Sequence, residues 1–145
     1  MSRFKATPSA TARKAAAEQA YFEWMPIREQ SDRRIFRRLQ FGSLIDLVML
    51  DTRIWGRQMQ TMGMMAPFND PMRTILGAAQ EQWFQEQITT SRATWKIVGQ
   101  QVMMGQLPQF LNTDAWDGYP AARTRFFSLL RSMRINDVVV LTGDI

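Results

Sequence analysis

The chain has 145 residues, of which 46% are hydrophobic, and it carries a formal net charge of +5 with neither cysteine nor histidine. This share of apolar residues predicts one folded domain, or one part of a larger one, and argues against wholesale disorder. The absence of histidine and cysteine excludes Ser-His-Asp and Cys-His catalysis, imidazole ligands and cysteine zinc sites, so a bound metal ion would have to rely on oxygen ligands.

The first third of the chain predicts one helix followed by two strands. Apolar residues recur at helical spacing over residues 12–24, and Pro26 cannot continue a helix. Residues 34–41 and 44–50 predict antiparallel strands joined by a tight turn at Gly42. Residues 1–11 are expected to be disordered; this start lacks the apolar core of a signal peptide, and we expect no membrane span.

The remainder predicts an alternation of helices and strands. An apolar helical stripe covers residues 74–88, and a second helix is expected to begin near Pro120, since proline is favoured at a first helical position. Residues 95–102 and 138–141 predict strands, the second apolar on both faces, which is typical of a strand buried under helices. The order β-α-β-α-β predicts three parallel strands in an α/β sandwich.

Two long connections leave the carboxyl ends of strands, where ligands bind in open α/β sheets. The same edge is expected to hold Asp51, Gln101 and Asp144. The apolar strand runs into Thr142, Gly143 and Asp144, and the carboxylate of Asp144 is the oxygen ligand that a hard cation prefers. Asp51 and Arg53 lie two residues apart, and the sequence leaves open whether they form a structural ion pair or bind an oxyanion.

Residues 114–120 combine two acids, two aromatic residues, a glycine and a proline just before the second of these helices. Asp117 either caps this helix or contributes to a site, and the spacing alone supports both interpretations. The first long connection also contains a methionine cluster, which is expected to pack or to be locally disordered rather than to contact a ligand. Its members are Met59, Met62, Met64 and Met65.

Fifteen arginines and three lysines make a competing hypothesis possible, a non-enzymatic basic α/β module that binds a polyanion or a protein partner. The dense basic patch consists of Arg33, Arg34, Arg37 and Arg38. At strand spacing these side chains divide between two faces, so we expect no specific nucleic-acid binding. Several aromatic side chains lie on helix faces and are expected in the core rather than in base stacking. They are Trp83, Phe84, Phe126 and Phe127.

Six segments are more specific in combination than any is alone. They are residues 19–28, 50–53, 76–83, 95–101, 114–120 and 141–144. The run Trp116-Asp117-Gly118-Tyr119 is the most unusual of them. In order and spacing the six resemble the PhoD-like alkaline phosphatases, a branch of the metallophosphoesterases.

The resemblance implies a partial calcineurin-like sandwich, with mixed sheets flanked by helices, calcium and iron ions at the strand ends, and a phosphate ester as substrate. Asp144 matches the aspartate of the family's Gly-Asp-x-His strand end and is the one metal ligand that can be carried over. Further residues are typical of the family and are expected to support the site, with no chemical role assigned. They are Asp51, Arg53, Trp116, Asp117 and Tyr119.

The family's histidine and its upstream Asp-x-x-Tyr, Cys and Asp-Asp-His-Glu-like segments have no counterpart in the chain. We therefore expect residues 1–145 to be a PhoD-like metallophosphatase domain truncated at both ends, inactive by itself, with its catalytic residues unassigned. By resemblance the parent hydrolase would be exported to the periplasm or beyond through a twin-arginine signal.

Overall fold

The computed structural model describes residues 9–61, 68–106 and 112–144 in two compact units, residues 1–34 and residues 35–145. The first unit contains helix α1, Ala10–Trp24. Ser9 caps its first turn, because the hydroxyl oxygen accepts the N–H of Ala12 at 3.1 Å. The helix predicted over residues 12–24 is confirmed, and the helix ends at Trp24, two residues before Pro26. The disorder expected for residues 1–11 is wrong for residues 9–11, because Ser9 caps α1 and residues 10 and 11 form its first turn, and residues 1–8 lie outside the described residues.

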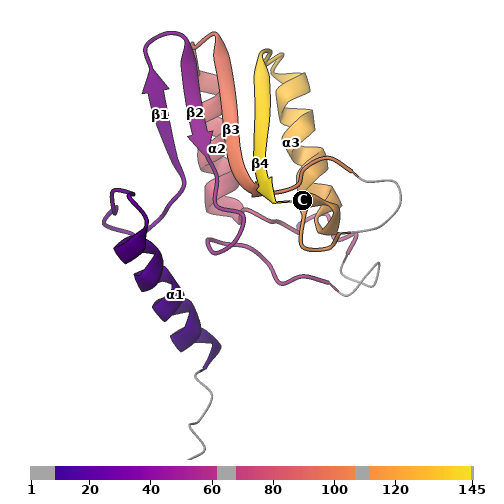
Figure 1. Ribbon diagram of the computed structural model, residues 1–145. Coiled ribbons are helices and arrows are strands. Elements are labelled where there is room, and N and C mark those ends of the chain that lie inside the picture. The colour runs from indigo at the N-terminus through magenta and orange to yellow at the C-terminus, as the bar shows by residue number, and fades with distance from the viewer. Residues whose placement is uncertain (1–8, 62–67, 107–111, 145) are drawn as a thin grey trace, which may run out of the picture. The chain divides into compact units, whose positions relative to one another are not determined.

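The second unit is built on a four-stranded mixed sheet in the order β1-β2-β3-β4. Its strands are β1 Arg37–Phe41, β2 Ile45–Met49, β3 Trp95–Val102 and β4 Val138–Asp144. The first two are antiparallel, and β2, β3 and β4 are parallel, as predicted (Figure 1). Gly42 takes a φ of 58° in the β1–β2 turn, a value that glycine adopts without steric cost.

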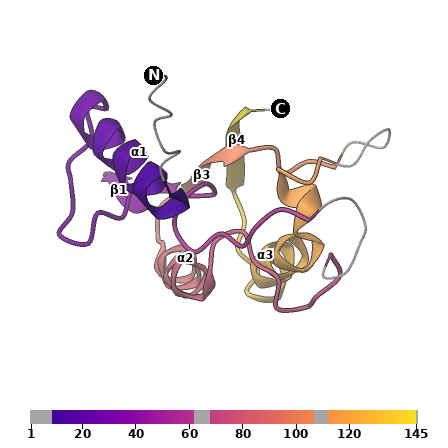
Figure 2. The ribbon, with the colours of Figure 1, turned by 90° about the horizontal axis from the view of Figure 1, so that it is seen from below.

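Two helices cover the same face of this sheet (Figure 2). Helix α2 spans Ala78–Thr90, and α3 spans Pro120–Ser132 directly after the short 3-10 helix η1, Trp116–Gly118. Helix α2 was predicted to start at Thr74, but Thr74 instead forms a turn in which its hydroxyl oxygen accepts the N–H groups of Leu76 and Gly77. Gly77 then precedes α2 with a φ of 75°.

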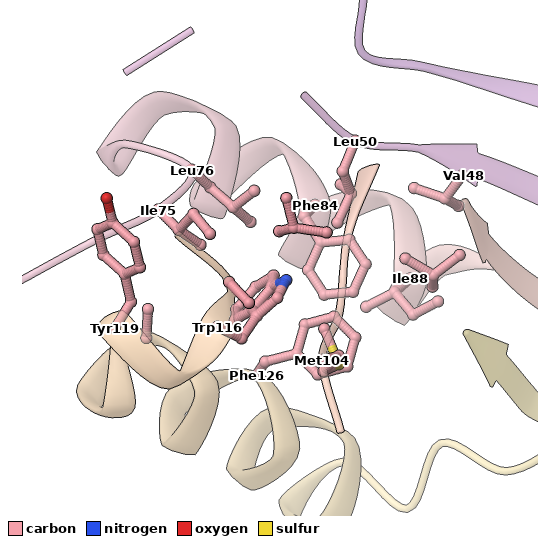
Figure 3. Close-up of a cluster of buried hydrophobic side chains, with 14 residues drawn as sticks. Val48, Leu50, Ile75, Leu76, Phe84, Ile88, Met104, Trp116, Tyr119 and Phe126 are labelled. Atoms are coloured by element: carbon pink, nitrogen blue, oxygen red, sulfur yellow. The ribbon is translucent and has the colours of Figure 1, made fainter. Parts of the chain in front are cut away.

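The core lies between the helices and the sheet (Figure 3). Phe84 of α2 stacks on Phe126 of α3 with ring centroids 4.9 Å apart, and Trp116 meets Phe126 edge to face at 5.7 Å. Burying one such side chain contributes about 1.5–3 kcal/mol. The prediction that Phe84 and Phe126 are core residues is confirmed and Trp83 is partly buried, whereas Phe127 is 46% exposed because it lies on another side of α3.

Strand β4 was expected to be buried on both faces, and this expectation is wrong for the described structure. Val138 and Val140 pack against the core, but Val139 and Leu141 are 39% and 53% exposed. Successive side chains of a strand point to opposite faces, so Val139 and Leu141 occupy the face without α2 and α3. The described residues form an α/β unit with a mixed sheet flanked by helices on one face. None of their helices is long and apolar enough to cross a membrane.

Candidate functional site

The carboxyl ends of β2, β3 and β4 meet at one edge of the sheet, which we call the carboxyl edge (Figure 1). Asp51 follows β2, Gln101 lies near the end of β3, and Asp144 ends β4. The Gln101 side chain joins two strands, because its amide nitrogen donates to Leu50 O at 2.8 Å and its oxygen accepts the Thr52 N–H at 2.8 Å. The predicted gathering of these residues at one edge is confirmed.

Asp51 organises the loop that leaves β2. Its side chain is 2% exposed and accepts the main-chain N–H groups of Arg53, Ile54 and Trp55 at 2.9, 2.9 and 3.0 Å. Gln80 of α2 holds the Asp51 main chain from the other side, with its amide oxygen 2.7 Å from Asp51 N. The carboxylate therefore fixes a turn, and of the two interpretations left open by the sequence, the ion pair between the side chains of Asp51 and Arg53 is wrong.

The Arg53 guanidinium instead bridges two other carboxylates. Its Nη1 donates to Asp114 Oδ2, and its Nη2 donates to Asp144 Oδ2 at 2.9 Å. Asp144 is 63% exposed, and Arg53 and Asp114 are each more than a third exposed. The arrangement connects the end of β4 with the segment just before η1.

Asp114 is held from its other side by Arg57, whose Nη2 lies 2.7 Å from Asp114 Oδ1. Burial alone would raise the pKa of the Asp114 carboxyl, but the hydrogen bond from Arg53 and the charges of Arg57 and Arg53 hold it below its ordinary value. The guanidinium groups of Arg53 and Arg57 and the carboxylates of Asp114 and Asp144 thus form one cluster of two cationic and two anionic side chains.

Trp116, Asp117 and Tyr119 are buried behind the edge, at 1%, 5% and 0% exposure. The Trp116 indole N–H donates to Gln100 Oε1 at 3.0 Å, inside the core. Asp117 makes no capping hydrogen bond; it pairs with Arg123 in the first turn of α3, so the cap interpretation is wrong. All three side chains are buried in or next to η1, so they are not exposed at the carboxyl edge.

Tyr119 and Arg73 together connect the two long loops, and the sequence did not single out Arg73. The hydroxyl of Tyr119 donates to Gln58 O at 2.6 Å, and the Arg73 guanidinium lies 4.4 Å from the centre of the Tyr119 ring. Arg73 is 3% exposed and donates to Gly118 O at 2.9 Å and to Met59 O at 2.7 Å. A lone arginine in a loop gives no pattern in the sequence from which this role could be predicted.

The part of the chain that the structure describes contains no group of three or more His, Cys, Asp or Glu side chains that could hold a metal ion. Asp144 nevertheless fits a hard cation chemically, because it is an exposed carboxylate at a strand end whose Oδ1 makes no hydrogen bond to the described residues. One carboxylate next to a guanidinium supplies one ligand of a site and no complete coordination shell.

The basic patch and the methionine cluster gain little support as a binding surface. Arg33 pairs with Glu29, Arg34 with Asp32, and Arg38 with the buried Asp46. These carboxylates offset the charge that a polyanion would meet. Met59 is 88% exposed, and the other three methionines lie outside the described residues.

Comparisons with known proteins agree with the sequence resemblance. The sequence model of the PhoD-like phosphatase family matches residues 2–145. Alkaline phosphatase D of Bacillus subtilis is 37% identical over 148 residues, and a solved structure of PhoD superposes with a TM-score of 0.84 at 34% identity. The matches cover 92% and 95% of this chain, but only 25% of the Bacillus protein and 30% of the solved chain.

Proposed function

The chain belongs to the PhoD-like phosphatase family, and we propose that it forms part of a metal-dependent hydrolase of phosphate esters, to which it contributes Asp144 as a metal ligand. The observation that carries the proposal is the position of Asp144, an exposed carboxylate at the carboxyl edge with one oxygen free of hydrogen bonds to the described residues. Ligands bind at this edge in open α/β sheets.

We further propose calcium and iron as the ions, because the resemblance implies both. Bound metal ions would supply a water of lowered pKa and would offset charge on the phosphoryl oxygens. The described residues would hold the carboxylate of Asp144 in place and exclude water behind it, through the buried Trp116 and Tyr119. Further ligands would have to come from segments beyond this chain, since the chain spans about a quarter of the curated relative.

A chimera tests the assignment. The segment of the Bacillus subtilis relative that aligns with this chain is replaced by residues 1–145, and hydrolysis of p-nitrophenyl phosphate and of bis-p-nitrophenyl phosphate is measured with calcium and iron present. We expect an active chimera that loses at least about 100-fold in kcat/KM with Asp144→Asn, because removal of a metal ligand affects both the nucleophile and the phosphoryl group. Asp137→Asn is the matched control, because Asp137 is an exposed aspartate just before the opposite end of the same strand, β4.

An active chimera whose Asp144→Asn variant keeps its activity would overturn the ligand assignment. The purified 145-residue chain should not hydrolyse either ester above the buffer rate. Turnover by this chain that disappears with Asp144→Asn would overturn the expectation that it is inactive alone.

We also propose that the parent hydrolase is exported, as the resemblance implies. Cell fractionation with an antibody against residues 1–145 checks this. A purely cytoplasmic signal would overturn it.

A further inference from the structure

Arg53 is the one residue that connects the proposed ligand Asp144 to the rest of the carboxyl edge among the side-chain contacts of the described residues. Its two Nη atoms donate to different carboxylates, Asp114 Oδ2 and Asp144 Oδ2. The planar guanidinium fixes the angle between these two donors, which a lysine ammonium on a flexible stem does not. A single side chain therefore relates the position of one carboxylate to that of the other.

The Asp114 end of this bridge is anchored. Arg57 is 9% exposed and donates to the main-chain oxygens of Thr52 and Asp114 at 2.8 and 3.0 Å, in addition to its ion pair with Asp114. Its guanidinium also lies 5.3 Å from the centre of the buried Tyr119 ring. Asp114 N donates to the side chain of Asn112 at 3.0 Å, which restrains the residue further.

The Asp144 end has no comparable anchor. Asp144 is the last residue of the edge strand β4, and its carboxylate is 63% exposed. Within the described residues its Oδ2 is bound by Arg53 and its Oδ1 has no hydrogen-bond partner. A carboxylate in this position would otherwise rotate freely about its side-chain bonds.

We propose that Arg53 is a positioning residue that holds the Asp144 carboxylate by one oxygen and leaves the other for a divalent cation, with Asp114 and Arg57 as its anchor. The inference rests on the proposed function, because the orientation of the Asp144 carboxylate matters only if this carboxylate binds a metal ion. Groups that orient a metal ligand commonly change metal affinity by 10- to 100-fold when they are removed. Exposed ion pairs contribute little to stability, so the bridge should affect geometry more than folding.

Nuclear magnetic resonance of the 145-residue chain with labelled aspartate and arginine side chains tests the positioning directly, without any metal. In the unmodified chain we expect scalar coupling across the hydrogen bond between the Asp144 carboxyl carbon and an Arg53 Nη. Asp114→Asn should shift the Asp144 carboxyl resonance although the two carboxylates do not touch, because it loosens Arg53. Arg92→Lys, an exposed arginine without an ion pair in the described structure, is the control and should leave that resonance unchanged.

Titration of the metal-free chimera with calcium chloride, followed by calorimetry, supplies the second measurement, because the described residues of the 145-residue chain offer one ligand and no complete coordination shell. Arg53→Lys keeps the positive charge and loses the fork, so we expect about 10-fold weaker calcium binding, whereas a purely electrostatic role predicts no change. Methylguanidinium added to Arg53→Ala should restore part of the affinity.

The outcomes separate the two proposals. If Asp144→Asn weakens calcium binding by the chimera while Arg53→Lys and Asp114→Asn leave both the Asp144 resonance of the 145-residue chain and the calcium affinity of the chimera unchanged, the positioning role is overturned and the ligand assignment stands. If Asp144→Asn leaves the calcium affinity of the chimera unchanged, the ligand assignment is overturned. Absence of the Arg53–Asp144 coupling in the unmodified chain, with an Arg57–Asp114 coupling visible, overturns the positioning role even if a variant fails to fold.

Discussion

Replacing Asp51 by alanine should destabilise the second unit through the loop that leaves β2. The carboxylate accepts three main-chain N–H groups, from Arg53 and Ile54 on Oδ1 and from Trp55 on Oδ2. Alanine leaves these donors without their acceptor in a region where the Asp51 side chain is 2% exposed. A buried N–H that loses its acceptor is unfavourable, because it gave up its hydrogen bond to water on folding and has no new partner.

The magnitude follows from the number and kind of the bonds. A hydrogen bond to a charged group contributes about 1.5–3 kcal/mol, and the sum over three is reduced because the loop can relax and admit water. We expect a loss of about 3–4 kcal/mol in the free energy of unfolding for Asp51→Ala. Asp51→Asn keeps one oxygen for the two Oδ1 bonds and opposes the Trp55 N–H with an amide nitrogen, so its loss should be about 1–2 kcal/mol.

Urea unfolding followed by tryptophan fluorescence measures both losses. With a typical slope of about 1–3 kcal/mol per molar urea, the alanine variant should shift the midpoint down by at least about 1 M. Asp137→Asn, an exposed aspartate with no side-chain hydrogen bond to the described residues, is the control and should change the free energy by less than about 0.5 kcal/mol. An Asp51→Ala variant that unfolds at the same urea concentration as this control would refute the account of the turn.

Two further predictions concern the close contact between Gly56 and Gly77 and the ion pair of the buried Asp46 with Arg38. Gly77→Ala should cost about 2–3 kcal/mol of stability, because Gly77 has a φ of 75° and an added Cβ would lie 2.7 Å from Gly56 Cα. Gly105→Ala, whose Cβ would meet only the flexible end of Met103 at 3.6 Å, should be nearly neutral in the same urea assay, and equal losses would contradict the steric argument. Burial would raise the pKa of Asp46, but hydrogen bonds from Arg38 and Ser91 hold this pKa below the ordinary value of 3.8. The ionised Asp46 therefore stabilises the fold above about pH 4, and this stabilisation is lost as the pH falls through the lower pKa of the folded state. Asp46→Asn should therefore flatten the fall in unfolding free energy below pH 4, and an unchanged acid slope would show that Asp46 does not carry it.

Much of the fold follows from periodicity and from the placement of proline. Strand β3 has the predicted bounds, α3 begins at Pro120, and the three parallel strands follow from the β-α-β-α-β order. The errors arose where a local hydrogen bond competes with an apolar pattern. Thr74 and Gly77 delay α2 although Leu76 continues its apolar stripe, and only the positive φ of Gly77 reveals the break.

The site was predictable in its location and unpredictable in its pairing. The ends of parallel strands must meet at one edge, so Asp51, Gln101 and Asp144 could be placed together from the strand order alone. The partner of Arg53 could not be predicted, because Asp114 lies 61 residues away along the chain. Asp51 is closer to Arg53 in the sequence and was therefore the favoured partner. Its carboxylate instead accepts main-chain N–H groups of the turn that follows it.

The exposed face of β4 shows what an apolar pattern can and cannot determine. Residues 138–141 are apolar on both faces, which is typical of a strand covered on two sides, and the described residues cover only the side of Val138 and Val140. On the other face Leu39, Val139 and Leu141 are 44%, 39% and 53% exposed. Contiguous exposed apolar surface of this kind marks a surface that packs against something. The second sheet implied by the resemblance would lie on this face. It would cover Val139 and Leu141, and it would explain why β4 is apolar on both faces although the described residues cover only one.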